Sequence, residues 1–368
     1  MKAMKPLVWP RFDRKTDRAV IDVLHSGRVN YWTGGNGRAF EAAFASYVGV
    51  KRAFAVANGT VALELALTAL GVGAGDEVVV TPYSFRASAT CAARVGARMV
   101  FADVGEDHLL NAETIEKAMT RRTKAIVVVH LYGEVVEMGP ILALAKKRGV
   151  FVVEDCAQCL GGEYRGRKVG TLGDVGCYSF CQSKHITAGG EGGMIVAKSA
   201  AVSKRVESLR DHGWIVGSEP KEFDLIGTNA RMTEIQSVIG LGELKRFESW
   251  NLPRRRRLAE AFMKGLVNHP LVRLAPVDTP TRRASFWLMP FVLDASKLTC
   301  SVATFIERMQ SEGALAYKIM WPLMAKTPVA SALVPDTVGF WVHPTYTLKD
   351  VRRTLAVFRK CSERFSKA

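Results

Sequence analysis

The sequence has little of several features that define other classes of protein. Its seven cysteines are an odd number and lack the spacing of a secreted disulfide scaffold, which favours reduced thiols. No apolar run approaches the roughly 18 residues of a membrane-spanning helix. The stretch MKAMKPLVWPRFDRK contains charge but not the apolar core of a signal peptide. We therefore expect a cytoplasmic globular protein without a membrane partner.

Four cysteines are close together in the sequence: Cys156, Cys159, Cys177 and Cys181. Their spacing alone is compatible with a zinc site. The first pair, however, follows the strand-like run VVED, and the second pair brackets CYSFC, which alternates like a strand. Small buried residues are the simpler interpretation, and we expect no metal.

Basic residues outnumber acidic ones by 51 to 35, which gives a formal net charge of +16. Such a charge is compatible with nucleic acid, a membrane surface or a small anionic ligand. The longest basic run, Arg254 to Arg257, opens a helical pattern, and we interpret it as a solvated helix face. Aromatic residues do not interleave with the basic ones, and no helix-turn-helix pattern is present. We therefore expect no nucleic-acid partner.

Short apolar runs alternate with helical ones through the first two thirds of the chain. Strands are predicted at residues 54–58, 77–82, 99–104, 124–133, 150–155, 176–180 and 192–197. Helices are predicted between them at residues 60–70, 84–97, 112–119 and 138–149. This order indicates βαβ units, and the Val/Ile-rich strands indicate a mainly parallel central sheet that helices sandwich on both faces. The predicted fold class is therefore α/β.

The last third of the chain has a different character. The run RRRRLAEAFMKGLV predicts a helix, residues 285–294 a strand, residues 301–313 a helix, and an amphipathic helix closes the chain. We expect a large domain over residues 1–245, including an N-terminal segment over residues 1–50, and a smaller C-terminal α+β domain over residues 246–368.

Polar residues follow several predicted strands, where parallel sheets bind their ligands. The tripeptide Asn58-Gly59-Thr60 ends a strand and opens a helix, whose free N–H groups can hold a phosphate. Asp155 ends the strand VFVVED, and Lys184 follows the strand GCYSF. The nearby run GGEGG fits neither a Walker loop, because no Lys-Ser/Thr pair follows, nor a dinucleotide fingerprint, because a strand follows.

Together with Phe85, these residues supply an anion site, a ring face, a carboxylate and an amine. Those are the groups that hold pyridoxal 5′-phosphate. A lysine amine can bond to a carbonyl carbon, and a carboxylate can keep a heterocyclic nitrogen protonated. Each residue by itself could instead be a helix cap, an ion-pair partner or a surface residue.

Several long motifs follow one another along most of residues 30–245: NGTVALELALTALGVGAGDEVVVTPYSFRASA, GARMVFADV, TKAIVVVHLYG, VVEDCAQCLGGEYRGRKVGTLGDVGCYSFCQSKHITAGGEGGMIV, LRDHG and GTNARMTEIQSVIG. In these motifs the chain resembles the DegT-type sugar aminotransferases, which are fold-type I enzymes that use pyridoxal 5′-phosphate. The C-terminal third follows the family more loosely.

The resemblance implies a role for each matching residue around the cofactor. Lys184 would be the catalytic residue that bonds to the cofactor, and Asp155 would pair with the ring nitrogen. Phe85 would stack on the ring, and Gln158 would lie against the ring or its hydroxyl. The phosphate would be bound by Gly59, Thr60 and Ser179.

The resemblance also implies a homodimer with shared active sites, because Asn229 would reach the phosphate bound by the neighbouring subunit. A substrate pocket would include three residues of the run VNYWTGG, namely Tyr31, Trp32 and Thr33.

The activity that follows from the resemblance is transfer of an amino group from glutamate or glutamine to a keto sugar. The sugar would be linked to a nucleoside diphosphate and serve amino-sugar, surface-polysaccharide or natural-product biosynthesis. Alternatives are a cyclitol or other keto-sugar aminotransferase, a sugar dehydratase with the same cofactor, and a non-catalytic regulator that binds it.

One branch of dehydratases has histidine in place of the lysine, and here His185 follows Lys184. The spacing from Ser179 to Lys184 is the spacing of the family, so His185 lies one place too far along. The sequence therefore favours a transaminase, and the intact pair of Lys184 and Asp155 argues against a regulator.

Overall fold

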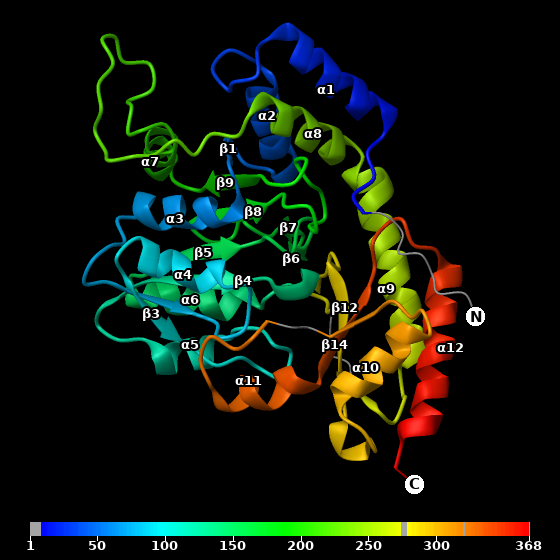
Figure 1. Cartoon of the computed structure of the whole chain (residues 1–368). Helices are drawn as coiled ribbons and strands as arrows, with labels where there is room; N and C mark the ends of the chain where they lie inside the picture. The colour runs from blue at the N-terminus through cyan, green and yellow to red at the C-terminus, as the bar shows by residue number, and fades with distance from the viewer. Residues whose placement is uncertain (1–8, 274–277, 319–320, 368) are drawn as a thin grey trace.

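The structure is a computed structural model that describes residues 9–273, 278–318 and 321–367 (Figure 1). A seven-stranded sheet lies at its centre, in the order β1-β9-β8-β5-β4-β2-β3. The strands are β1 (Ala53–Val56), β2 (Glu77–Val80), β3 (Arg98–Phe101), β4 (Thr123–Val129), β5 (Phe151–Asp155), β8 (Val175–Ser179) and β9 (Gly193–Ala197). Strands β8 to β3 pair in parallel, whereas β9 runs antiparallel between β8 and β1. The predicted fold class is confirmed.

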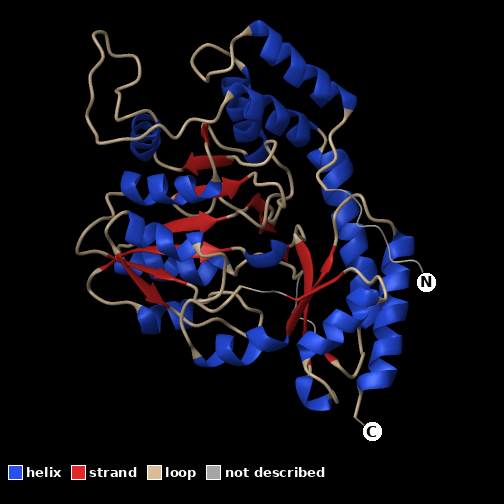
Figure 2. Ribbon diagram, in the orientation of Figure 1, coloured by secondary structure: helices blue, strands red, loops and turns tan. Residues whose placement is uncertain are grey.

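Helices pack around this sheet (Figure 2). They are α3 (Gly59–Ala69), α4 (Ala87–Arg94), α5 (Ala112–Ala118), α6 (Met138–Arg148) and α7 (Ala200–Arg210). The run EVVV of β2 is buried at every position, as expected for a strand covered on both faces. The predicted elements are confirmed within a few residues, except that α4 is shorter than predicted and that the strand predicted over residues 124–133 ends at Val129, before the 3-10 helix Leu131–Gly133. The chain turns before Ala87, and Gly96, with a φ of 86°, follows the end of the helix.

Two N-terminal helices lie beside a helix from much later in the chain. Helices α1 (Arg14–Ser26) and α2 (Asn36–Val48) both pack against α8 (Glu234–Lys245). The residue before α2 is Gly35, which has no side chain to cap the helix. The buried Glu234 supplies the cap instead, because its carboxylate accepts hydrogen bonds from the backbone N–H groups of Asn36, at 2.6 Å, and Gly37, at 2.8 Å.

The C-terminal part contains a second, antiparallel sheet in the order β10-β12-β14-β13. Its strands are β10 (Val272–Arg273), β12 (Leu288–Leu293), β13 (Ala316–Lys318) and β14 (Thr337–Trp341). The helices of this part are α9 (Leu252–Leu266), α10 (Val302–Ser311), α11 (Pro328–Leu333) and α12 (Leu348–Phe365). The short elements of the chain are β6 (Glu163–Tyr164), β7 (Arg167–Lys168), β11 (Arg282–Arg283), η1 (Leu131–Gly133), the π-helical η2 (Phe247–Asn251), η3 (Ala295–Lys297) and η4 (Val334–Asp336).

Helix α9 contributes to two hydrophobic cores. Leu252, at its start, packs in the core around the large sheet, and Leu258, further along the helix, packs in the core around the small one.

The domain boundary after residue 245 stays a prediction. No helix in the described ranges is long and apolar enough to cross a membrane.

Candidate active site

The predicted site residues on β5 and β8 lie at one edge of the large sheet. These strands are parallel neighbours, and Asp155 on β5 pairs in register with Cys177 on β8. Ser179 is the last residue of β8, and Lys184 lies in the loop that follows. Because both strands end at this edge, the carboxylate, the hydroxyl and the amine are brought to the same end of the sheet.

The Asp155 carboxylate is buried, with 4% of the residue exposed, and it is held from two sides. Its Oδ2 accepts a 2.7 Å hydrogen bond from the Ser88 hydroxyl of α4, and its Oδ1 accepts a 3.0 Å bond from the Ala157 backbone N–H. These two bonds hold both oxygens of the carboxylate in place. The Asp155 carboxylate is therefore a fixed acceptor. Its orientation depends on Ser88 of α4, a helix that follows β2 and not β5.

The amine of Lys184 lies over an aromatic ring. Its Nζ is 4.7 Å from the centroid of the ring of Trp287, the residue directly before β12. Burial lowers the pKa of Lys184 below its ordinary value, while the nearby Asp155 carboxylate acts in the opposite direction. A lysine with a lowered pKa has a larger share of free amine near neutral pH, which is the form that bonds to a carbonyl carbon or accepts a proton.

His185 occupies a different environment from Lys184. Its ring is buried, makes no hydrogen bond within the described residues and meets the Phe247 ring edge-on, with 6.2 Å between centroids. Burial lowers the pKa of His185 well below its usual range, and the Arg255 guanidinium acts in the same direction. His185 is therefore a neutral core residue in this conformation, and Lys184 is the one that faces the Trp287 ring.

The loop that carries Lys184 is held by groups that sequence reasoning missed. The indole Nε1 of Trp287 donates a 2.6 Å hydrogen bond to the Ser183 carbonyl. The Asn251 amide donates a 2.5 Å bond to the His185 carbonyl. The backbone on both sides of Lys184 is thus fixed by the C-terminal part of the chain.

Arg255 of α9 continues this network. Its Nε donates a 2.7 Å hydrogen bond to the Asn251 Oδ1, and its Nη1 lies 3.5 Å from the Trp287 carbonyl oxygen. The side chain is 0% exposed, so the interpretation of the basic run as a solvated face is wrong for Arg255, although Arg254 and Arg257 are exposed. Burial lowers the pKa of Arg255 to about 9, partly offset by Glu243. Arg255 stands three or four residues from Leu252, Leu258 and Ala259, and this helical spacing from apolar residues could have indicated its inward position.

The predicted phosphate residues meet at the start of α3. The Asn58 side chain caps the helix by accepting a 2.9 Å bond from the Val61 N–H. A Cβ added to Gly59 would lie 2.7 Å from the Ser179 Cβ, so only glycine allows α3 and the end of β8 to come this close. Gly59 and Thr60 thus open α3 directly beside the Ser179 side chain, and helix N-termini of this kind favour phosphate.

The aromatic candidate follows β2 and the amide candidate follows β5, and β4 lies between these two strands in the sheet. Phe85 is 53% exposed and meets Trp321 edge-on at 6.4 Å between ring centroids. Gln158 is buried, and its Oε1 accepts a 3.1 Å bond from the backbone N–H of Tyr132. Phe85 therefore has a ring face available, whereas the amide oxygen of Gln158 already has a partner.

Asn229 is exposed, and the residue after it in the chain is hydrogen-bonded to the residue before the N-cap of α3. Asn229 pairs with Asp211 in an isolated β-bridge, and the next residue, Ala230, accepts a 2.8 Å hydrogen bond from the Ala57 N–H. Ala57 precedes the α3 cap, Asn58. Asn229 thus leaves its own side chain at the surface, near the phosphate end of the site.

The three predicted substrate residues are not in described contact with Lys184 or Asp155. Tyr31 is buried, and its hydroxyl donates a 2.9 Å hydrogen bond to Glu41 and accepts one of 3.1 Å from Arg210. Trp32 is exposed and meets the Trp214 ring edge-on at 5.1 Å. Thr33 is exposed and bonds to the Asn30 carbonyl. Their role in a substrate pocket stays a prediction.

The four clustered cysteines do not converge on a common point through their hydrogen bonds. The thiols of Cys156, Cys159 and Cys177 approach three different backbone carbonyls. Among the described residues, the three side chains close enough to share an ion are His130, Glu154 and Cys156, with ligand atoms within 4.8 Å of one another.

The Glu154 carboxylate of that group is already bound by protein donors. It accepts hydrogen bonds from the His130 Nε2 and from the backbone N–H groups of Gly170, Leu172 and Gly173. The His130 Nδ1 accepts a 3.1 Å bond from the Val136 N–H. These atoms tie the loop before β8 to β5, and they have a structural use without an ion.

The donor set fits pyridoxal 5′-phosphate. Three groups lie where β5, β8 and β1 end. They are a buried carboxylate, a lysine amine with a lowered pKa, and a helix N-terminus at which a glycine allows close packing. Lys184 would hold its carbonyl carbon and Asp155 its ring nitrogen, and Gly59 and Ser179 would together hold its phosphate.

Comparisons with known proteins place the whole chain in a family. The sequence model of the DegT/DnrJ/EryC1/StrS aminotransferase family matches residues 10–340. The chain is 44% identical, over 230 residues and 62% of its length, to UDP-N-acetyl-3-dehydro-alpha-D-glucosamine 3-aminotransferase of Acidithiobacillus ferrooxidans. That match covers 61% of the Acidithiobacillus protein, which is less than two thirds of its length.

Two further comparisons extend over almost the whole chain. GDP-perosamine synthase of Caulobacter vibrioides is 34% identical over 364 residues, which cover 94% of this chain and 95% of that protein. The X-ray structure of the aminotransferase from Psychrobacter cryohalolentis superposes with a TM-score of 0.91 at 33% identity, and covers 97% of this chain and 99% of that one.

Proposed function

Because the chain belongs to the DegT/DnrJ/EryC1/StrS aminotransferase family, we propose that it is a pyridoxal 5′-phosphate-dependent sugar aminotransferase. It transfers an amino group from glutamate or glutamine to a keto sugar linked to a nucleoside diphosphate. The observation that carries the proposal is the Lys184 amine, with its lowered pKa, at the same sheet edge as the anchored Asp155 carboxylate.

Each residue has a task that follows from its surroundings. Pyridoxal 5′-phosphate, when bound, supplies an aldehyde carbon that amines attack and a ring that draws electrons from the carbon of the amino donor. Lys184 would hold its aldehyde carbon in the resting enzyme, and as a free amine it would accept the α-proton of the donor and later return a proton. Asp155 would hold a proton on the ring nitrogen. The N–H groups at the start of α3, with Ser179, bind the phosphate.

The position of His185 supports a transaminase over a dehydratase. Its ring packs against Phe247 in the core, whereas the Lys184 amine lies over Trp287. A base at position 185 would need its ring to leave a buried position.

The sugar substrate is inferred from chemistry and likeness together. The two curated relatives named above carry UDP and GDP sugars in their names. The net charge of +16 suits a diphosphate, which requires cations for binding. We extend the proposal to a homodimer with shared sites, supported by the exposed Asn229 and by the exposed apolar residues Phe223 and Ile226 near it.

An absorption spectrum of the purified protein tests the proposal. We expect a visible band from lysine-bound cofactor, which L-glutamate removes and which Lys184→Ala does not form. The exposed Lys147→Ala is the matched control and should keep both properties. The absence of a band after soaking with pyridoxal 5′-phosphate would contradict the cofactor. A band that neither glutamate nor glutamine changes would contradict transamination.

A further inference from the structure

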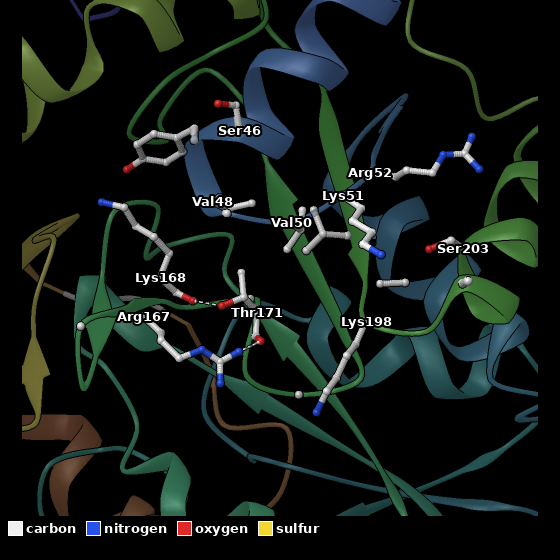
Figure 3. Close-up of a pocket in the computed structure, with 18 of the residues that line it drawn as sticks. Ser46, Val48, Val50, Lys51, Arg52, Arg167, Lys168, Thr171, Lys198 and Ser203 are labelled. Atoms are coloured by element: carbon white, nitrogen blue, oxygen red, sulfur yellow. Dashed lines mark hydrogen bonds between the residues drawn. The ribbon is translucent and has the colours of Figure 1, made fainter.

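A cavity of about 680 Å³ lies away from the candidate active site. It is formed by the segment between α2 and β1, the loop around β7 and the connection from β9 to α7. Figure 3 shows Lys51, Arg167 and Lys198 around the same hollow, each from a different one of these segments.

The cavity lies at the opposite edge of the large sheet from Lys184. Gly173, which lines it, precedes β8, whereas Lys184 follows the other end of that five-residue strand. Lys51 likewise precedes β1, whereas Gly59 follows it. At about 3.3 Å per residue, β8 alone separates the two sites by about 16 Å. The cavity is therefore distinct from the site proposed for the cofactor and its substrates.

The charge of the cavity is of one sign. Its lining includes six basic side chains and no acidic one. The basic residues are Lys51, Arg52, Arg167, Lys168, Lys198 and Lys204. Arg52 pairs with Glu207, and Lys168 pairs with Glu163 and Glu248.

The remaining four cations have no carboxylate within ion-pair distance among the described residues. Asp174 follows Arg167 in the sequence, and its Oδ2 accepts a 2.8 Å bond from the Val152 N–H. Grouping like charges without counter-ions costs free energy, which a bound anion would recover.

The start of helix α7 adds partial positive charge to the cavity. It is an 11-residue helix that begins at Ala200, and its N-cap, Ser199, makes no side-chain capping bond. Ala200, Ser203 and Lys204 from its first turns line the cavity. Free N–H groups of a helix start and lysines from separate segments together favour the oxygens of an anion, such as a phosphate, over apolar groups.

We propose that this cavity is a second ligand site that binds the diphosphate group of a small phosphorylated molecule. A volume of about 680 Å³ is within the range of small-molecule sites and exceeds the size of one phosphate. The cations come from three segments, so they can contact a group longer than a single phosphate. The site does not depend on the transamination chemistry.

Calorimetric titration with inorganic pyrophosphate tests the proposal on the protein saturated with pyridoxal 5′-phosphate, so that the start of α3 is filled. The test variant is Lys51→Ala with Lys198→Ala. The matched control is Lys146→Ala with Lys147→Ala, which removes two exposed lysines from α6. Near-ultraviolet circular dichroism checks that both variants are folded.

Apart from binding at the proposed substrate site, which neither pair of substitutions touches, we expect one pyrophosphate per chain in the wild type and the control, and about tenfold weaker binding of it in the test variant, because charge-assisted hydrogen bonds are lost. Equal affinity in all three proteins, or no binding in any, would overturn the site. Sulfate binding as tightly as pyrophosphate would overturn the diphosphate assignment. Binding of a duplex oligonucleotide but not of pyrophosphate would assign the cations to nucleic acid and overturn the proposal.

Discussion

At the scale of single residues, the Asp155 carboxylate depends on the hydroxyl of Ser88. The 2.7 Å bond between them joins β5 to α4, and Ser88 in turn lies 3.1 Å from the Ser84 hydroxyl. Both serines are buried. The orientation of the carboxylate toward the proposed ring nitrogen is therefore set by a chain of hydroxyl groups.

Ser88→Ala should weaken the binding of pyridoxal 5′-phosphate by about 10- to 150-fold, because a hydrogen bond to a charged group contributes about 1.5–3 kcal/mol. Titration of the apoprotein, followed by absorbance, measures this. Ser311→Ala removes a hydroxyl that bonds to its own helix on α10 and should have no effect. Unchanged affinity in Ser88→Ala would show that Asp155 holds its position without the serine.

His343 makes stability dependent on pH. Its ring nitrogens have no hydrogen-bond partner in the described chain, and the ring stacks on Tyr346 with 5.7 Å between centroids. Burial lowers the pKa of His343 to about 3, and Arg255 acts in the same direction. The unfolded chain therefore binds this proton more readily, so stability is full above about pH 6.5 and falls as the pH drops toward 3.

His343→Phe should reduce the loss of stability between pH 7 and pH 5 by about 1–2 kcal/mol, because phenylalanine cannot be protonated. Urea unfolding at the two pH values measures the difference. His25→Phe, at an exposed position on α1, is the control. An equal loss in wild type and His343→Phe would contradict a buried neutral imidazole.

At the scale of elements, η2 and α9 act as a support for the Lys184 loop. Asn251 ends η2, and Arg255 lies one turn further along α9. Asn251 donates to the His185 carbonyl and accepts from Arg255, so the two elements are linked to the backbone beside Lys184. A helix mostly in the C-terminal part thus positions the amine at the edge of the large sheet.

Asn251→Asp should lower the free energy of unfolding by about 1–3 kcal/mol, because it keeps the acceptor for Arg255 but leaves the His185 carbonyl without its donor. The rate of the glutamate half-reaction should fall as well, since the Lys184 loop is released. Chemical unfolding and stopped-flow absorbance measure the two effects.

Glu260→Gln, at an exposed position of α9, is the control for this variant and should change stability by less than about 0.5 kcal/mol. A destabilised Asn251→Asp protein with an unchanged rate would show that the support is structural and does not position Lys184.

At the scale of the whole molecule, the segment between α7 and α8 stands away from the body (Figure 1). It exposes large apolar side chains, with Phe223 62% and Ile226 100% exposed. Exposed apolar residues that gather in one segment indicate an interface. Asn229 lies in the same segment, after Gly227 and Thr228, which agrees with the proposed dimer in which this residue reaches the neighbouring subunit.

Phe223→Asp combined with Ile226→Asp should convert a dimer into monomers of about the 40.3 kDa chain mass, because charges would be buried at the interface. Light scattering coupled to size-exclusion chromatography measures the mass. Val267→Asp, at an exposed apolar residue after α9, should leave the mass unchanged. A wild-type protein that is already monomeric would contradict the shared site.

The tertiary structure also separates residues that one motif placed together. Lys184 and His185 are neighbours, yet the amine faces Trp287 and the ring faces Phe247. Arg254 to Arg257 are consecutive, yet Arg255 is fully buried. Side chains along a loop or helix point in different directions, so a run of similar letters does not share one environment.

The sequence by itself determined the α/β fold and the position of Asp155, Ser179 and Lys184 at strand ends, because apolar periodicity and strand ends are local properties. Only the tertiary structure decided which groups hold them. Ser88 lies 67 residues from Asp155, and Asn251 lies 66 residues from His185. Likewise, the basic cavity joins three segments that no local pattern relates. Contacts over such distances depend on how whole elements pack, which residue order alone does not fix.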